Sequence, residues 1–401
     1  MGMCWIFGLG TLLSWNIVST IGDYLYELFP DYHPARVLTL VYLPFSLATI
    51  AIFSYNESRI DTRKRNITGY VLFFISNFSI AVLDLATSGY GGMGKYVGVC
   101  FLVAVSGVAD AHVQGGMIGD LALMCPELIQ SFLAGLAASG ALTSILRLIT
   151  KAAFENIEHG LRKGALVFLT ISTVFEFLCI LLYVFFFPNL PIVKYYRAKA
   201  AREGSKTVVS DLNAVGVLLE SNQQSENNVN NHQERFNNKQ LVSQNIDYLM
   251  DLFLVCGVTL SIFPGFLYEN TGSHKLGSWY PIVLVTTYNV SNLISRYVPV
   301  IQCLKIESRK GLVMFVLSRF LLVPAFYFTA RYGNEGWMIA LVFVLGSTTG
   351  YPTVCVMTSA PRKYNGPEKN ALGNLLVLSL QSGILFGVAL DWLWMIGNGR
   401  F

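Results

Sequence analysis

Residues 279–301 read WYPIVLVTTYNVSNLISRYVPVI. This stretch is apolar and long enough to cross a membrane as a helix. Asn289, Asn292 and Arg296 follow one another at intervals of three and four residues, so a helix places them on one stripe. A guanidinium and two carboxamides are costly in hydrocarbon and persist there only when they face protein, water or a ligand. The stretch therefore predicts a membrane-spanning helix with a functional polar stripe.

The composition of the whole chain is that of a polytopic membrane protein. Of its 401 residues, 53% are hydrophobic and 13% are charged, whereas soluble proteins carry about a quarter charged residues. The net charge of +4 is small, and its basic residues lie in short loops between apolar runs, so no nucleic-acid partner is expected. The seven scattered cysteines give neither a disulfide framework nor a CxxC metal site.

Apolar runs of about 20 residues, the length that a ~30 Å hydrocarbon core requires, predict eleven spans. They are 3–28, 35–55, 67–88, 96–121, 127–150, 164–187, 246–267, 276–302, 311–330, 336–359 and 370–396. Lysine and arginine are denser in the loops around 59–65, 194–206, 305–310 and 362–369. The positive-inside rule makes these loops cytosolic, with the N-terminus in the cytosol and the C-terminus outside.

The predicted fold is all-α and polytopic, with eleven helices in two bundles and a major-facilitator-like alternating-access architecture. Residues 1–188 hold helices one to six, and residues 246–401 hold helices seven to eleven. Between them, 189–245 is predicted to be a disordered cytosolic loop, because its Asn/Gln-rich centre has almost nothing to bury. We expect this loop to be a simple tether between the two bundles rather than a segment that carries regulatory phosphorylation.

Polar residues also occur in spans one and four. Leu12 and Trp15 share a helical face, with Asn16 beside it, and an indole with a carboxamide can stack on and hydrogen-bond a planar heterocycle. Packing between helices would explain the same residues. Gln114 lies one turn from Asp110 on span four, and the glycines that follow allow close helix approach.

Other features favour a transporter over an enzyme. Phe263-Pro264 predicts a kink in span seven, and Arg319 is expected to pair with an acidic side chain. No HExxH, GxSxG or P-loop pattern occurs, and the histidines form no cluster. We therefore expect no catalytic residues, no metal and no cofactor.

Several short segments together resemble the equilibrative nucleoside transporter family, especially its plant branch. Residues 8–16, GLGTLLSWN, are similar to the family's GLGTLLPWN, and residues 114–119 fit its Gln-Gly start in span four. Phe263-Pro264 matches the family's Phe-Pro in span seven. Residues 317–324 resemble its LARLVFVP, and residues 350–363 resemble its NGY…PKK. The resemblance runs almost from end to end of the chain.

This resemblance implies a nucleoside held in a central cavity between two bundles. It implies seven substrate-binding positions: Leu12, Trp15, Asn16, Gln114, Asn289, Asn292 and Arg296. It gives Phe263, Pro264 and Arg319 gating or structural roles. In the family's span-eight motif, Asn-x-x-Asp-x-x-Gly-Arg, the acid contacts the base and the arginine contacts the ribose.

This chain departs from that motif at Asn292 and Ser295, which replace the acid and the glycine. A carboxamide gives up a charge-assisted hydrogen bond of about 1.5–3 kcal/mol for a neutral one of about 0.5–1.5 kcal/mol. It also cannot take up a proton. If transport is coupled to protons, another acid such as Asp110, Asp84 or Glu176 must carry them.

The predicted function is transport of nucleosides such as adenosine and uridine, with nucleobases as a further candidate, by facilitated diffusion or proton symport. The chain is expected to be a multi-pass protein of the lipid bilayer, in the plasma membrane or alternatively the vacuolar membrane. One alternative is a weakened or non-transporting nucleoside-binding relative, as Asn292 and Ser295 suggest. Another is a sugar or amino-acid carrier of the major facilitator type, which would have twelve spans.

Overall fold

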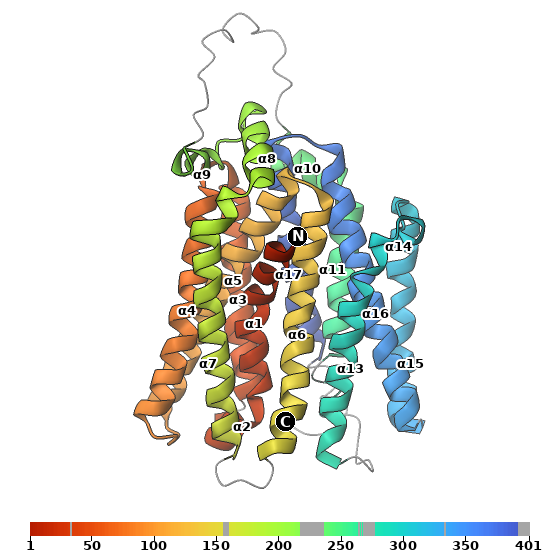
Figure 1. Ribbon diagram of the computed structural model, residues 1–401. Coiled ribbons are helices and arrows are strands. Elements are labelled where there is room, and N and C mark those ends of the chain that lie inside the picture. Colours follow the sequence, from red (N-terminus) through yellow and green to blue (C-terminus); the bar gives the residue numbers. More distant parts are fainter. Residues whose placement is uncertain are drawn as a thin grey trace, which may run out of the picture.

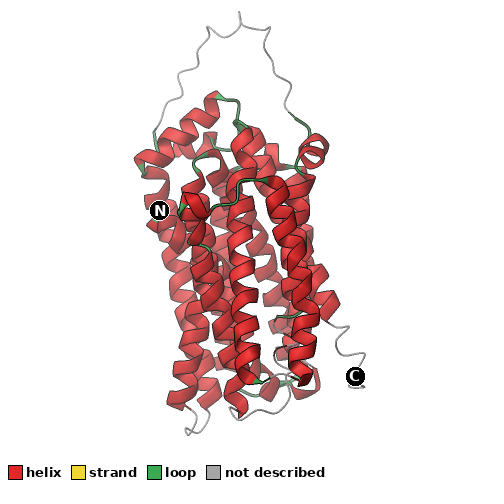
Figure 2. Ribbon diagram, turned by 90° about the vertical axis from the view of Figure 1, so that its right-hand side faces the viewer, coloured by secondary structure: helices red, strands yellow, loops and turns green. Residues whose placement is uncertain are grey.

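The structure is a computed structural model that describes residues 1–32, 34–154, 160–216, 236–263, 265, 267, 277–332 and 334–391. Nearly all of these residues are helical, and the longest helices run side by side along the length of the molecule (Figures 1 and 2). For convenience we call α1–α7 the N-terminal set and α11–α17 the C-terminal set.

The N-terminal set consists of α1 (Gly2–Thr20), α2 (Gly22–Leu28), α3 (Pro34–Tyr55), α4 (Thr62–Ala86), α5 (Met93–Leu123), α6 (Pro126–Phe154) and α7 (Gly160–Leu181). Three shorter helices follow: α8 (Pro191–Arg202), α9 (Val209–Ala214) and α10 (Asn238–Gln244). The C-terminal set consists of α11 (Ile246–Leu260), α13 (Tyr280–Ser295), α14 (Arg309–Ser318), α15 (Leu322–Tyr332), α16 (Glu335–Ser359) and α17 (Pro367–Asp391). Short 3-10 or π turns are η1 (Pro30–Tyr32), η2 (Glu57–Arg59), η3 (Leu182–Phe186), η4 (Phe187–Asn189), η6 (Gly277–Trp279), η7 (Val298–Val300), η8 (Gln302–Leu304), η9 (Arg319–Leu321) and η10 (Ala360–Lys363).

Local chemistry sets several helix starts. The Asp61 carboxylate accepts hydrogen bonds from the backbone N–H groups of Arg63 and Lys64, at 2.9 and 3.2 Å, and so caps α4. The Asn334 side chain caps α16 in the same way. Each cap satisfies N–H groups that the first helical turn leaves without a partner.

The two sets meet along six helices, three from each set. Within the N-terminal set α1 packs along α6, and within the C-terminal set α13 packs along α16. Across the sets, α17 lies against α3 and α5, while α13 and α16 lie against α6. The shorter helices α8, α9 and α10 cover one end of the molecule, which we call the loop end (Figure 1).

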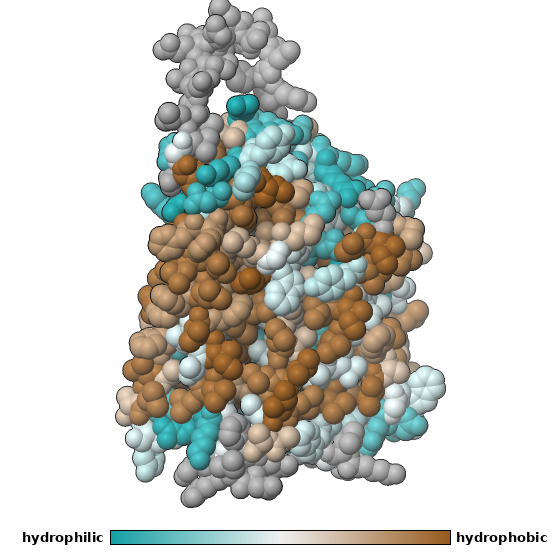
Figure 3. Space-filling model, in the orientation of Figure 1, coloured by the Kyte–Doolittle hydropathy of each residue, from teal (hydrophilic) through white to brown (hydrophobic). Residues whose placement is uncertain are grey.

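The outer surface suits a bilayer. Apolar side chains cover the middle of the face in Figure 3, and hydrophilic ones gather at the loop end. The exposed large apolar side chains include Phe45, Ile52, Phe101, Leu142, Phe177, Leu321 and Trp337. Such a surface would be unfavourable in water and is favourable in hydrocarbon.

Nine helices of the described part are long and apolar enough to cross a membrane, and the bent pair α10–α11 would make a tenth. Helices occupy all eleven predicted positions, but α13 has only 16 helical residues. The number eleven and the division into six and five therefore stay predictions. The first predicted span, 3–28, is broken in the structure, because the helix is interrupted at Ile21 between α1 and α2.

The prediction that 189–245 is disordered throughout is wrong at both ends of that segment. Residues 191–202 and 209–214 form α8 and α9, and residues 238–244 form α10. The apolar residues Val193, Val208 and Leu241 are each buried here, which the polar average of the segment hides. Residues 217–235, the Asn/Gln-rich centre, lie outside the described residues.

Candidate functional site

Two of the predicted site residues bond to the same helix, α6. Asn16 of α1 donates to the Ser139 hydroxyl at 2.6 Å, and Asn289 of α13 donates to the Ser144 hydroxyl at 2.7 Å. Gly140 lies between these two serines, and a Cβ there would come within 2.8 Å of the Asn289 Oδ1. The small face of α6 therefore brings carboxamides from both sets to one strip of the bundle.

Arg296 also bonds to α6. It follows the last residue of α13, and its guanidinium donates to the Leu133 carbonyl oxygen. The Gln130 side chain donates in return to the Arg296 carbonyl oxygen at 3.1 Å. The arginine is 9% exposed. It is thus held across the two sets by neutral partners, which leaves its charge available to a ligand.

Asn292 lies beside Arg296 but faces α16. Its Oδ1 is 3.5 Å from the Arg296 Nε, at the limit of a hydrogen bond. A Cβ on Gly350 of α16 would lie 2.6 Å from that Oδ1 and 2.2 Å from the Ser295 hydroxyl. Glycine at 350 therefore makes room for the serine at 295. The three residues of the predicted stripe thus face two different helices, α6 and α16, and their role in binding a solute stays a prediction.

Two other predicted site residues, Trp15 and Gln114, make contacts away from α6, with side chains of α3 and α17. The Trp15 ring lies 4.4 Å from the ring of Tyr42 on α3, between centroids. The side-chain amide of Gln381, on α17, donates to the Gln114 Oε1 at 2.8 Å and to the Asp110 Oδ2 at 2.7 Å. Asp110 is fully buried, and its other oxygen, Oδ1, has no hydrogen-bond partner. This group also joins the two sets, since Gln381 comes from the C-terminal set.

The adjacent residues Trp15 and Asn16 connect the two groups, because one faces α3 and the other faces α6. Leu12, one turn earlier on α1, packs against the apolar core. Leu12, Trp15, Asn16 and Asn289 are only partly buried, although they lie inside long helices. An indole face, carboxamides and a guanidinium are the groups that can stack on and hydrogen-bond a polar planar solute.

The gating residues are described in part. The ring of Phe263 stacks on Tyr288 at 4.0 Å between centroids. Pro264 lies outside the described residues. The structure shows no acidic partner of Arg319 among the described residues. Its guanidinium donates to the hydroxyls of Thr259 and Thr349, each at 2.8 Å. Among the residues that the structure describes, hydroxyls and a backbone carbonyl oxygen accept the hydrogen bonds of this buried charge.

Sequence reasoning missed Tyr42, Gln381 and the serines of α6. Gln381 could have been found, because it is an amide within the apolar run of span eleven. The positions of Ser139 and Ser144 in the sequence do not predict their partners, and in the structure each accepts a side-chain hydrogen bond. Among the described residues, no group of three His, Cys, Asp or Glu side chains could hold a metal ion.

The two sets also meet at the loop end. Arg65 of α4 donates to the Asn374 side chain of α17 at 2.8 Å, and Asn370 of α17 donates to Glu57 at 2.6 Å. On α1, the Trp5 indole donates to the Tyr297 hydroxyl at 3.0 Å. Polar contacts therefore hold the loop end of the bundle closed in this structure.

A helical bundle with an apolar surface and polar groups buried between two sets is typical of a polytopic membrane transporter. Residues 100–396 match the nucleoside transporter family. Equilibrative nucleotide transporter 3 of Arabidopsis thaliana is 62% identical over 398 residues, which cover 99% of this chain and 94% of that protein. Equilibrative nucleotide transporter 5 of the same plant is 60% identical with the same coverage. The chain belongs to the nucleoside transporter family, which confirms the predicted resemblance and the prediction of a transporter that is not an enzyme.

Solved structures support the fold class. The proton:xylose symporter XylE, of the major facilitator superfamily, aligns with a TM-score of 0.60 at 12% sequence identity. The alignment covers 99% of this chain and 88% of that one. At this identity the likeness concerns the fold alone, and it confirms the predicted all-helical, major-facilitator-like architecture.

Proposed function

We propose that this chain carries nucleosides across a membrane by alternating access, with the solute held between the two sets of helices. The observation that carries the proposal is the pairing of both sets through polar side chains in the middle of the bundle. Asn289 meets α6, and Gln381 meets α5. A solute that replaces such contacts can change which end of the bundle is open. Family membership favours a nucleoside over a sugar or an amino acid.

In this proposal six of the seven predicted residues, all except Leu12, contact the base or the ribose of the solute. Trp15 stacks on the base, while Asn16 and Gln114 hydrogen-bond its edge. Arg296 and Asn289 hold the ribose hydroxyls, since a guanidinium offers several donors in a fixed geometry. Asn292 supplies a neutral contact beside Arg296. The same set fits a nucleoside better than a nucleotide, because Arg296 alone among the seven is cationic and a phosphate calls for several donors.

A proton partner, if present, is proposed to use Asp110. Asp84 is paired with Lys95 at 2.8 Å and with Arg162 at 3.0 Å, so its charge is already balanced. Glu176 contacts Ser14 within the N-terminal set. Asp110 meets Gln381 of the other set, so a change in its protonation would act where the sets must part.

We propose the plasma membrane as the location, with the vacuolar membrane as the alternative. The loop end is proposed to face the cytosol, because the basic residues gather there. This places the N-terminus in the cytosol and the C-terminus outside.

The test is uptake of radiolabelled adenosine and uridine by a transport-deficient cell that expresses the chain. Saturable uptake that unlabelled nucleosides compete with, and xylose or amino acids do not, is the expected result. Uptake at background, restored by Asn292→Asp with Ser295→Gly, would instead favour a weakened relative that binds nucleosides.

A further inference from the structure

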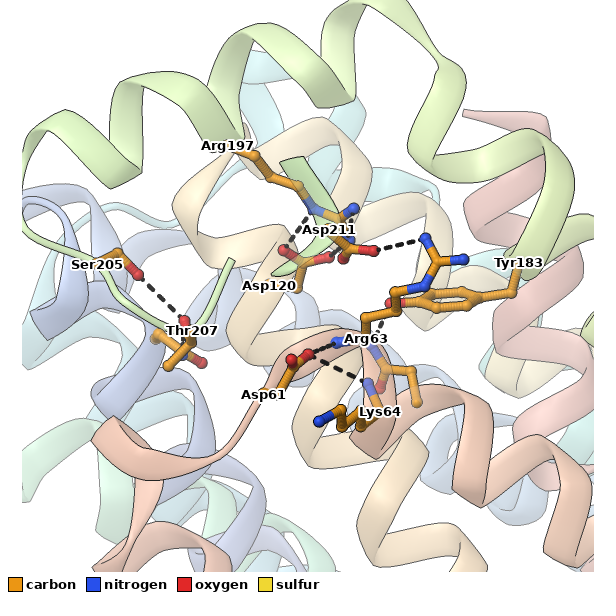
Figure 4. Close-up of polar contacts among 11 residues, drawn as sticks. Asp61, Arg63, Lys64, Asp120, Tyr183, Arg197, Ser205, Thr207 and Asp211 are labelled. Carbon is orange, nitrogen blue, oxygen red and sulfur yellow. Dashed lines mark hydrogen bonds and ion pairs between the residues drawn. The ribbon is translucent and has the colours of Figure 1, made fainter. Parts of the chain in front are cut away.

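Two of the helices between the two sets, α8 and α9, are attached to the N-terminal set by buried ion pairs (Figure 4). Arg197 of α8 is 1% exposed and pairs with Asp120 of α5 at 2.5 Å and with Asp211 of α9 at 2.7 Å. Arg63 of α4 pairs with the same Asp211 at 3.3 Å. Separating such a pair would leave a buried charge without a partner. α8 and α9 therefore stay with α4 and α5.

Further contacts strengthen this attachment. The Thr62 backbone N–H donates to the Thr207 carbonyl oxygen at 3.1 Å. The Arg197 guanidinium also lies 5.4 Å from the centre of the Phe187 ring, which packs against Phe7 of α1. Although burial alone lowers the pKa of Arg197, Asp120 and Asp211 raise it above its ordinary value. The Arg197 guanidinium therefore keeps its charge although it is buried.

The described contacts of the same segment with the C-terminal set are fewer and are hydrogen bonds, one of them partly exposed and the other buried. Glu203, directly after α8, accepts a hydrogen bond from the Gly366 backbone N–H at 2.8 Å. Its side chain is 33% exposed. The Thr207 hydroxyl accepts from Asn370 of α17 at 3.3 Å. Water can replace these hydrogen bonds when the partners separate, so they part more readily than the buried ion pairs.

Gly366 allows the close approach. Its φ of +46° is a left-handed conformation that glycine adopts readily, and a Cβ there would lie 3.0 Å from Glu203. Directly beneath, Asn370 shares its amide between Thr207 and Glu57. The segment thus lies over the contacts that close the loop end.

We propose that residues 191–214 form a strap, carried by the N-terminal set, that closes the loop end against the start of α17. The loop end then opens only when Glu203 and Thr207 leave Gly366 and Asn370. The strap gives the intervening segment a role in transport beyond joining the sets. The proposal rests on alternating access in the proposed function, and its tests follow the conformation separately from the solute.

The first test links the strap to α17 with Thr207→Cys and Asn370→Cys in a protein depleted of its native cysteines. Oxidation is expected to lower nucleoside uptake at least tenfold, and a reductant is expected to restore it. The matched control links the same strap residue to its own set with Thr62→Cys and Thr207→Cys, and should retain most of its uptake when oxidised. Failure of the first pair to cross-link, or full uptake by the cross-linked protein, would overturn the strap.

The second test needs no transported solute. It uses the variant Ser54→Cys to report whether the loop end is open. Ser54 is 4% exposed and donates to the Asn374 carbonyl oxygen of the other set. In permeabilised membranes, Glu203→Ala is expected to raise its rate of maleimide labelling several-fold, and the Thr207–Asn370 cross-link to lower it. Arg202→Ala, on an exposed neighbour, serves as the control and should leave the rate unchanged.

An unchanged rate in Glu203→Ala contradicts the strap. A chain that labels as expected but takes up no nucleoside keeps the strap and overturns the proposed function. The two proposals can therefore fail separately.

Discussion

Arg296 shows how a single charge can remain available inside a membrane protein. Its described partners are the Leu133 carbonyl oxygen and the Asn292 carboxamide, and both are neutral. A ligand hydroxyl can therefore compete for the guanidinium without separating an ion pair.

Replacing Arg296 with Ala is expected to lower kcat/KM for uridine uptake at least tenfold, since a hydrogen bond to a charged group contributes about 1.5–3 kcal/mol. Initial uptake rates at several uridine concentrations measure this, with surface expression checked by labelling. Arg331→Ala, at an exposed arginine that donates to Tyr327, is the control and should transport normally. Undiminished uptake in Arg296→Ala would remove this residue from the site.

Asp110 is the second residue whose role can be measured. If its carboxyl carries a proton, uptake by the native chain should be faster at pH 5.5 than at pH 7.5 and should fall with a proton uncoupler. Asp110→Asn, which imitates the protonated form, should lose both responses but still exchange internal for external nucleoside. Glu307→Gln is the control, because the side chain of that acid is 70% exposed, and it should keep both responses. Retention of both responses in Asp110→Asn would contradict the assignment.

At the scale of elements, α13 and α16 pack through glycines. A Cβ on Gly346 would lie 2.1 Å from the Ser291 hydroxyl, and one on Gly350 would lie 2.4 Å from the Asn292 carbonyl oxygen. The second contact is with backbone, so a rotamer change cannot relieve it.

Gly350→Ala is therefore expected to destabilise the purified transporter by about 1–3 kcal/mol, the usual cost of overpacking. Thermal unfolding in detergent, followed by tryptophan fluorescence or by aggregation, measures the change. Gly164→Ala is the matched control, because its added Cβ would meet nothing within 4 Å and should be neutral or stabilising. Equal stability of the two variants would mean that α13 and α16 do not pack this closely.

Sequence predicted the helices well and their partners poorly. Apolar length located α4, α5 and α17 because bilayer thickness fixes how long an apolar run must be. Apolar length does not predict which side chains meet. The contact of Asn16 with Ser139, and that of Gln381 with Gln114, each join residues far apart in the chain. The polar average composition of residues 189–245 likewise does not predict α8. Its buried Arg197 pairs with Asp120 on α5, which is distant in the sequence.

For the whole molecule, alternating access requires the loop end to open while the middle of the bundle holds the solute. In this structure Arg65, Glu57 and Trp5 each make contacts that keep that end closed. Transport therefore requires a second state in which these contacts are exchanged for others, and the solute must stabilise the passage between the two.

The most direct measurement of the central claim is nucleoside counterflow in liposomes that hold the purified chain. With excess unlabelled uridine inside, labelled uridine outside should enter, rise above its equilibrium level for a time and then leave. Liposomes with the Arg296→Ala variant, or loaded with xylose in place of uridine, should show no such overshoot. An overshoot with xylose, or none with uridine or adenosine, would contradict a nucleoside carrier that works by alternating access.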